Sequence, residues 1–465
     1  MSQPSLIEID RKHLIHPVIN YRAHEARGTT VLDAGHGAWL RDIDGNEVLD
    51  AFSGLWCVNV GYGQASLVEA AARQMTKLPY ATTYFHFASE PAIELADKLV
   101  SLAPASLQRV YFTLGGSDAV DSAIRFITHY FNATGRSSKK HMIALARGYH
   151  GSSSIGAGLT ALPAFHRHFD LPLATQHHIP SPYAYRGEFA DDAALIAASV
   201  ASLEAKVATL GADNVAAFFC EPIQGSGGVI VPPPGWLKAM REACRRLGIL
   251  FVADEVITGF GRTGPLFACE AEGVEPDLMT VAKGLTSGYA PMGALLMSEE
   301  IYQGIAGDAN DTAIVGHGQT YSAHPVSAAV ALEVLSLYHE GGLLANGQAQ
   351  APRFAAGLDA LLEHPLVGES RHRGLLGALE LVADKESRAR FDPSLKLPER
   401  IAAAAWRNKL LFRAFGDNIL GFAPALCYSE KEFEFMFGRL QRTLDEVLDE
   451  PEVRAALRRA STAVV

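Results

Sequence analysis

Hydrophobic residues gather in short runs along the middle of this 465-residue chain, and each run has the length of a buried β-strand. Between several runs the apolar positions instead recur with the period of an α-helix, at 118–131, 192–209, 236–247 and 326–339. The predicted strands are residues 109–114, 142–146, 215–220, 249–253, 278–282 and 291–297. Alternating strands and helices predict an α/β fold, in which helices cover both faces of a mostly parallel central sheet.

The pattern changes after about residue 330. A helix is followed by a strand-like segment from Leu375, another helix, a hairpin around 416–418 and a last amphipathic helix. The apolar stripe of that helix is Phe433, Met436, Phe437, Leu440, Leu444 and Leu448. We expect a large domain at 59–330 and a smaller α+β domain formed by residues 1–58 and 331–465.

The amino-acid composition excludes some classes of binding partner. The chain has 40 Lys and Arg against 51 Asp and Glu, a formal net charge of −11, so we expect no nucleic acid and no anionic membrane as partner. No run of apolar residues is expected to reach membrane-spanning length. The five scattered cysteines form no C-x-x-C pair, which favours a cytoplasmic protein without disulfides. Small molecules are the expected partners.

Two kinds of motif invite other interpretations. Gly259, Gly261 and Gly264 have the spacing of a dinucleotide-binding loop, but Pro265 follows where such a loop must open a helix, so we expect no such site. The histidine pairs His166/His168 and His177/His178 have no acidic or thiol partner at ligand spacing. We therefore expect no metal site there.

Charged residues follow two of the predicted strands. Asp254 ends the run ILFVA, and Lys283 follows LMTVA. In a parallel sheet, ligands bind at the carboxyl ends of the strands, so both side chains are expected in one crevice. Either residue alone is more often a cap, a surface ion pair or a solvated side chain, but a desolvated lysine forms Schiff bases.

A third strand, VYFTL, runs into GGSDAVDSAIRF. Gly115 and Gly116 allow close approach of the backbone, and Ser117 or Asp118 is expected to cap the helix that follows. The N-terminus of this helix is a candidate phosphate site. An amine, a carboxylate and a phosphate site together match the needs of pyridoxal 5′-phosphate.

Long motifs in a fixed order then give a resemblance to a family. They are FSGLWCVNVGYG, RGYHGSSS, CEPIQGSGG, ADEVITGFGRTG, VAKGLTSGYAPMG and GHGQTYSAHP. The chain resembles the class III aminotransferases, which are fold type I enzymes that use pyridoxal phosphate, and within them the amine (omega):pyruvate branch. The resemblance implies an omega-aminotransferase that works as a homodimer or a tetramer.

The resemblance also implies roles for single residues. Lys283 looks like the lysine that binds the cofactor and moves the proton, and Asp254 like the acid that keeps the pyridine nitrogen protonated. The residues that resemble further cofactor contacts are Gly116, Ser117, Tyr149, Glu221, Val256 and Thr320, the last supplied by the neighbouring subunit. The chain departs from the usual Ser-Gly-Ser turn at Gly115, which removes one expected contact near the phosphate.

Residues of the expected substrate pocket also differ from those of related branches of the family. Ser226 stands where the ornithine and 4-aminobutyrate branch has a glutamate, and Ile257 where that branch often has glutamine. Both favour pyruvate as the acceptor. Arg413 resembles a mobile arginine that pairs with the carboxylate of the acceptor; a surface arginine beside a hairpin is the alternative. Trp56, Tyr84 and Phe85 resemble walls of the substrate pocket, with packing at a dimer interface as the alternative.

The implied reaction moves an amino group from a primary amine, a diamine or an omega-amino acid to pyruvate. Other class III enzymes remain alternatives: a 2-oxoglutarate-dependent aminotransferase, a decarboxylase or an aminomutase. A binding protein that retains an inactive fold is the non-enzymatic alternative, and the presence of both Lys283 and Asp254 argues against it. The amine donor and the stereochemical preference stay open.

Overall fold

The computed structural model describes residues 5–307 and 313–462, and its centre is a seven-stranded sheet. Every strand runs parallel to the others except β10, which pairs antiparallel with both of its neighbours. In spatial order the strands are β4 (Leu107–Thr113), β10 (Gly293–Ser298), β9 (Leu278–Val281), β8 (Leu250–Asp254), β7 (Val215–Cys220), β5 (His141–Leu145) and β6 (Gln176–Ile179). The predicted mostly parallel sheet is thus confirmed, with β6 as a strand that the sequence did not predict.

Helices cover both faces of this sheet. Phe218 and Phe219 are adjacent in β7, yet Phe218 packs in one hydrophobic cluster and Phe219 in another, because successive side chains point to opposite faces. The Phe219 face is covered by α6 (Gly116–Ala133) and α9 (Glu299–Ala306). The Phe218 face is covered by α5 (Glu90–Leu102), α7 (Asp192–Leu210), α8 (Trp236–Leu247) and α10 (Pro325–His339), and α4 (Ala65–Lys77) packs on α10.

Helix α7 corrects one expectation from the sequence. By length and composition it is apolar enough to cross a membrane, because it is rich in alanine, so the prediction that no stretch reaches that length is wrong. In the structure α7 packs on α8, and its buried residues recur every four positions, at Leu195, Ser199, Leu203 and Val207. Core helices pass the same test, so this single helix is weak evidence for a membrane span.

The C-terminal part contains a second, antiparallel sheet. Its strands, in spatial order, are β11 (Val367–Arg373), β12 (Leu376–Leu381), β15 (Ile419–Phe422) and β14 (Arg413–Phe415). The predicted hairpin is confirmed between β14 and β15, where Asn418 adopts a positive φ of 66°. The helices of this part are α11 (Leu343–Ala360), α12 (Leu397–Arg407), α13 (Glu430–Leu448) and α14 (Pro451–Thr462). The predicted apolar stripe lies on α13, and Phe433, Met436, Leu440 and Leu444 are fully buried.

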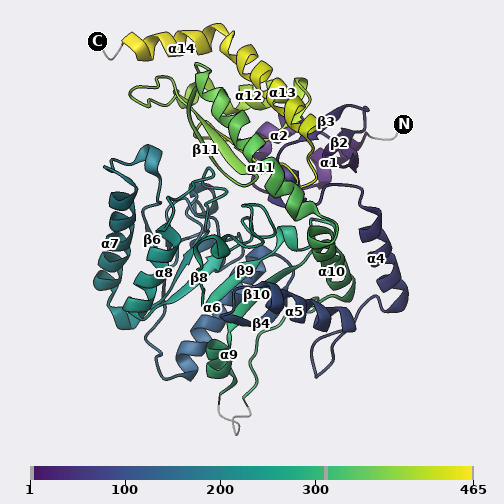
Figure 1. Ribbon diagram of the computed structural model, residues 1–465, viewed down its shortest axis with the longest axis vertical. Helices are drawn as coiled ribbons and strands as arrows, with labels where there is room; N and C mark the ends of the chain where they lie inside the picture. Colours follow the sequence, from purple (N-terminus) through teal and green to yellow (C-terminus); the bar gives the residue numbers. More distant parts are fainter. Residues whose placement is uncertain (1–4, 308–312, 463–465) are drawn as a thin grey trace.

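The N-terminal segment lies beside this C-terminal part (Figure 1). Strand β3 pairs in parallel with β13, which closes a small four-stranded sheet. The elements involved are α1 (Leu6–His13), α2 (Tyr21–Arg27), β1 (Leu32–His36), β2 (Trp39–Asp42), β3 (Glu47–Asp50), α3 (Ser53–Trp56) and β13 (Leu410–Leu411). The division into domains at 59–330 and at 1–58 with 331–465 stays a prediction.

Candidate active site

A cavity of about 400 Å³ lies at the carboxyl ends of the central strands and extends to the N-terminal segment and to β14. Most of the predicted site residues line it: Trp56, Gly116, Ser117, Tyr149, Glu221, Asp254, Val256, Lys283 and Arg413. Residues from opposite ends of the chain therefore share one pocket. Lys283 and Asp254, the pair on which the predicted chemistry depends, face the same cavity.

Asp254 is the last residue of β8 and is only 3% exposed. A buried carboxylate is costly unless donors surround it. Here Nδ1 of His150 lies 2.8 Å from Oδ2, and the backbone N–H of Val256 donates to Oδ1 at 3.2 Å. The carboxylate is therefore held in one orientation toward the cavity.

His150 is a site residue that the sequence analysis did not single out, although it follows Tyr149 within the motif RGYHGSSS. It is 1% exposed, and its Nε2 has no hydrogen-bond partner within the described parts of the chain. Burial alone would lower the pKa of His150, but the hydrogen bond and charge of Asp254, with the charge of Glu221, raise it. The imidazole thus favours the form that donates to Asp254.

Lys283 comes directly after β9 and has a positive φ of 39°, a strained conformation for a residue with a side chain. Burial lowers the pKa of its amine, and the charges of Asp254 and Glu221 oppose this only partly. The neutral amine is the nucleophilic form. Its Nζ lies 6.0 Å from the ring centroid of Trp56, so it is directed into the cavity.

The phosphate cradle predicted at the start of α6 is geometrically open. The helix begins at Gly116, and its cap residue is Gly115, which has no side chain to bond to the N–H groups of the first turn. The expectation that Ser117 or Asp118 caps this helix is wrong, because both already lie inside it. Free N–H groups at a helix N-terminus bind anions. A Cβ at Gly116 would lie 2.9 Å from Val256, so only glycine fits there.

Glu221 supports the loops on either side of the cavity. The backbone N–H of Tyr149 donates to its Oε1 at 2.9 Å, and that of Gly225 to its Oε2 at 2.8 Å. Burial raises the pKa of Glu221 to about 7, with Asp254 adding to the rise and His150 opposing it. Its predicted place among the cofactor contacts stays a prediction, while its structural role is to join two loops.

The outer half of the cavity is mostly apolar. Trp56 is buried between Phe52, with ring centroids 4.5 Å apart, and Phe415, at 6.3 Å. Two further walls, which the sequence did not identify, are Leu162 and Phe165. The remaining lining residues are Pro17, Val18, Leu55, Val120, His150, Gly151, Ser226, Ile257 and Phe415. An apolar chain of a substrate can be buried here.

Three predicted site residues lie outside this lining. Phe85 is 81% exposed, and Tyr84, at 39%, has its ring 5.8 Å from that of Phe85. Thr320 lies in the loop before α10, and its carbonyl accepts a hydrogen bond from the Tyr80 hydroxyl at 2.8 Å. A single chain does not bring them to the cavity. Their roles, including a contribution of Thr320 to a neighbouring subunit, stay predictions.

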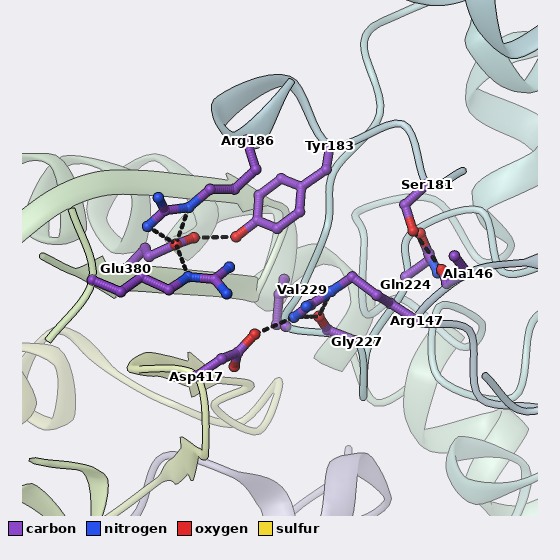
Figure 2. Close-up of polar contacts among 12 residues, drawn as sticks. Ala146, Arg147, Ser181, Tyr183, Arg186, Gln224, Gly227, Val229, Glu380 and Asp417 are labelled. Atoms are coloured by element: carbon purple, nitrogen blue, oxygen red, sulfur yellow. Dashed lines mark hydrogen bonds and ion pairs between the residues drawn. The ribbon is translucent and has the colours of Figure 1, made fainter. Parts of the chain in front are cut away.

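Buried polar contacts fix the loop that carries Ser226 (Figure 2). The guanidinium of Arg147 donates to the carbonyl of Gly227 at 2.6 and 2.9 Å and pairs with Asp417 of the β14–β15 hairpin. Arg371, from β11, donates to the carbonyls of Gly228 and Val229. The loop that carries Ser226 is therefore held by two arginine side chains, Arg147 and Arg371.

Glu380 of β12 is fully buried and joins the two parts of the chain. It accepts hydrogen bonds from the Tyr183 hydroxyl and from Nε of Arg186, the latter at 2.6 Å (Figure 2). Nη1 of Arg371 lies 3.3 Å from Oε2, the oxygen that also accepts from Tyr183. Because a buried carboxylate needs such partners, these contacts fix the second sheet relative to the large one.

The glycine-rich segment after β8 opens no α-helix; the next element is a short 3₁₀ turn at Ala268–Glu272. Instead the segment buries Arg262, whose Nη2 donates to Oδ1 of Asn59 at 2.6 Å and whose Nη1 donates to the carbonyl of Pro424. Gly261 has a φ of 83°, which favours glycine. The glycines therefore serve a turn that joins the N- and C-terminal segments.

The cavity fits pyridoxal phosphate by the chemistry of its donors. It combines a buried amine of lowered pKa, a buried carboxylate held by an imidazole, and a helix N-terminus with free N–H groups. Lys283 would bond to the aldehyde, Asp254 would face the ring nitrogen, and the first turn of α6 would receive the phosphate.

Comparisons with known proteins agree with this fit. The family model "Aminotransferase class-III" matches residues 21–444. The putrescine–pyruvate aminotransferase of Pseudomonas aeruginosa is 40% identical over 442 residues, 94% of this chain and 95% of that one. The diaminobutyrate–2-oxoglutarate transaminase of Halomonas elongata is 37% identical over 452 residues, 96% of each chain.

Solved structures give the same result. The omega transaminase of Pseudomonas jessenii, crystallised in complex with PMP, superimposes with a TM-score of 0.93 at 37% identity and covers 96% of this chain and 98% of its own. A (S)-enantioselective omega-transaminase from Thermomicrobium roseum has a TM-score of 0.92 at 38% identity, over 96% and 98% of the two chains. This chain therefore belongs to the class III aminotransferases, and its cofactor is pyridoxal 5′-phosphate.

Proposed function

We propose that this aminotransferase moves the amino group of a primary amine, a diamine or an omega-amino acid to pyruvate, giving alanine and an aldehyde or ketone. The observation that carries the proposal is the charge in the cavity. Arg413 is the one arginine among the residues that line it in the described chain, and no carboxylate in residues 5–307 or 313–462 forms an ion pair with it. One free guanidinium suits one carboxylate.

Arg147 lies outside the residues that line the cavity and is already engaged. Arg147 donates to the carbonyl of Gly227 and pairs with Asp417, so a second substrate carboxylate would have to displace that contact. Burial of an unpaired carboxylate is unfavourable by several kcal/mol. A monocarboxylic acceptor such as pyruvate fits this cavity better than 2-oxoglutarate, which has two carboxylates.

The donor is accommodated by the apolar walls. Trp56, Phe165 and Phe415 offer no charge that would repel an alkyl or aryl chain. An uncharged chain fills this half of the cavity during the first half of the reaction, and the pyruvate carboxylate reaches Arg413 during the second. The same pocket can thus serve both substrates.

The side chains divide the chemical work. Bound pyridoxal phosphate supplies an aldehyde and an electron-withdrawing ring. Nζ of Lys283, whose pKa is lowered by burial, takes the proton from the amine-bearing carbon of the donor and returns it in the reverse direction for pyruvate. Asp254, oriented by His150, would hold the proton of the ring nitrogen.

The test is a panel of amines with pyruvate or 2-oxoglutarate, in which alanine and glutamate are measured. We expect alanine, with a kcat/KM for pyruvate roughly 10-fold or more above that for 2-oxoglutarate, a difference of about 1.4 kcal/mol. Faster formation of glutamate would instead assign the chain to the group of the Halomonas relative. Release of carbon dioxide without alanine would indicate a decarboxylase.

We also propose that the chain works as a homodimer. The support is that Tyr84, Phe85 and Thr320 match the family's site motifs yet lie outside the cavity of one chain, and that Phe85 and Ile314 are more than 80% exposed. Exposed apolar side chains of this size are typical of interfaces. Sedimentation analysis should give twice the mass of 49.9 kDa, and a monomer that is fully active would contradict the proposal.

A further inference from the structure

Three side chains near the N-terminus form a compact polar cluster. Asp10 lies in the last turn of α1, His16 in the loop that follows and His24 in α2. Nε2 of His16 lies 2.7 Å from Oδ1 of Asp10, and Nε2 of His24 lies 3.0 Å from Oδ2. The three side chains are 10–25% exposed, and the two imidazole centroids are 4.3 Å apart. Both rings therefore direct the same nitrogen toward one carboxylate.

We propose that Asp10, His16 and His24 bind a divalent transition-metal ion, and that Zn²⁺ is the preferred one. Two imidazoles and a carboxylate, with a water molecule in the fourth position, form a common zinc ligand set. The ligand atoms of the three residues all lie within 4.8 Å of one another. Ligands about 2.1 Å from a tetrahedral ion are about 3.4 Å apart, so small side-chain movements are sufficient to admit it.

The protons balance in a simple way. Each Nε2 lies within hydrogen-bond distance of the Asp10 carboxylate, which accepts from the ring when it is ionised. When the ion binds Nε2, each neutral imidazole carries its single proton on Nδ1, and any doubly protonated ring releases its second proton to solvent. No oxidation or reduction takes place, and the carboxylate changes its partner from hydrogen to metal.

The position of the cluster gives the ion a consequence for the cavity. The loop 14–20 runs between the ligands: Asp10 lies before it, His16 in it and His24 after it. Pro17 and Val18, at the tip of this loop, line the active-site cavity. Val18 has a φ of 51°, an outlier for a β-branched residue, so the loop needs support from outside. A bound ion would hold this wall of the cavity in place.

The first experiment titrates the metal-free holoenzyme with ZnCl₂ in a calorimeter. The variants are His16→Gln with His24→Gln, and Asp10→Asn alone; the matched control is His13→Gln, an exposed histidine at the end of the same helix. We expect one high-affinity Zn²⁺ in the wild type and in the control, and an affinity lower by roughly 100-fold in the variants, since the double variant loses two ligands and Asp10→Asn weakens one. Equal binding by all four proteins would overturn the site.

The second experiment measures amide hydrogen exchange of residues 14–20 with and without ZnCl₂. Exchange should slow in the wild type and in His13→Gln, and stay unchanged in the double variant. Zinc binding without slower exchange would overturn the support of the loop. Neither measurement uses activity, so both are independent of the proposed transfer to pyruvate. Unaltered circular dichroism of the variants shows that they are folded.

Discussion

The imidazole of His150 and the carboxylate of Asp254 form a buried pair, with Nδ1 2.8 Å from Oδ2. His150 lies in the loop after β5 and Asp254 at the end of β8, and β7 lies between these two strands in the sheet. The pair therefore crosses the floor of the cavity. It fixes the orientation of the Asp254 carboxylate, which would face the ring nitrogen of the cofactor.

Replacing His150 tests this positioning role. His150→Ala should lower kcat by roughly 10- to 100-fold, the usual effect of removing a group that orients a reacting one, with little change in the KM for the amine. His150→Asn places an amide N–H near the position of Nδ1 and should restore most of the rate. Steady-state kinetics of the two variants give the comparison. Equal losses in both would show that the imidazole does not act through its hydrogen bond.

The same pair predicts a pH dependence of stability. The pKa of His150 is raised above the ordinary value of 6.5, so the protonated ring stabilises the fold; this contribution is fully present below pH 6.5 and is lost as the pH rises through the raised pKa. Compared with His150→Asn, which does not titrate, the wild type should gain about 1.5–3 kcal/mol below pH 6.5.

Thermal unfolding of both proteins across the pH range measures this difference. The comparison is made in a Glu221→Gln background, because Glu221 titrates in the same window, with a pKa raised to about 7, and that pKa itself depends on His150. A gap in Tm that widens as the pH rises would have the wrong sign for this pair.

Lys283→Ala should abolish multiple-turnover activity. The loss of the amine that accepts and returns the proton is expected to lower kcat by roughly 10²- to 10⁴-fold or more, and the visible absorbance of the lysine-bound cofactor should disappear. Lys238→Ala, on the exposed face of α8, is the matched control and should keep both. The assay follows alanine formation and the absorption spectrum. A variant of residue 283 that turns over normally would exclude the proposed mechanism.

The sequence predicted the sheet well where strands are buried on both faces. All six residues of β7 are buried, and the apolar run at 215–220 matches it to the residue. Strand β6 reads QHHI and lies at the edge of the sheet, where polar side chains are tolerated, so its pattern gave no signal. Periodicity detects burial, and an edge strand is only half buried.

The sequence likewise predicted some residues of the site and missed others. Asp254 and Lys283 were found because a charged residue after an apolar strand has a position that the topology fixes. The partner of Asp254, His150, lies 104 positions away in sequence, and nothing in the spacing of the two residues indicates their contact. The Asp10 cluster spans only 14 positions, but its three side chains come from two helices and a loop, so no fixed helix or strand spacing indicates their contact.

Gly116→Ala tests the cradle at the start of α6. The new Cβ would lie 2.9 Å from Cγ1 of Val256, so either Val256 or the first turn of the helix must move. Overpacking of this kind is unfavourable by about 1–3 kcal/mol. We expect the free energy of cofactor binding to be weakened by a similar amount. Gly115→Ala is the matched control: its Cβ would have no neighbour within 4 Å, and its φ of −179° suits any residue.

The dissociation constant of pyridoxal phosphate from each apoenzyme measures the effect. The control should bind as the wild type does. If Gly115→Ala were the weaker variant, the phosphate would depend on the backbone of residue 115 and not on the position of the helix turn.

Ser226→Glu tests how the cavity selects its acceptor. Ser226 and Arg413 both line the cavity, and a glutamate at 226 would place a negative charge in competition with the pyruvate carboxylate for that arginine. We expect the KM for pyruvate to rise by roughly 10-fold, which corresponds to about 1.4 kcal/mol of lost binding. The half-reaction with an amine donor whose chain carries no charge should keep its rate.

Ser226→Gln separates charge from size, because the amide has the shape of the carboxylate without its charge. It should leave the KM for pyruvate close to the wild-type value. The two half-reactions are followed separately by the absorbance of the cofactor in single turnovers. If Ser226→Glu slowed the amine half-reaction and left the pyruvate half-reaction unchanged, residue 226 would face the donor chain, and the selectivity for pyruvate would have to arise from Arg413 alone.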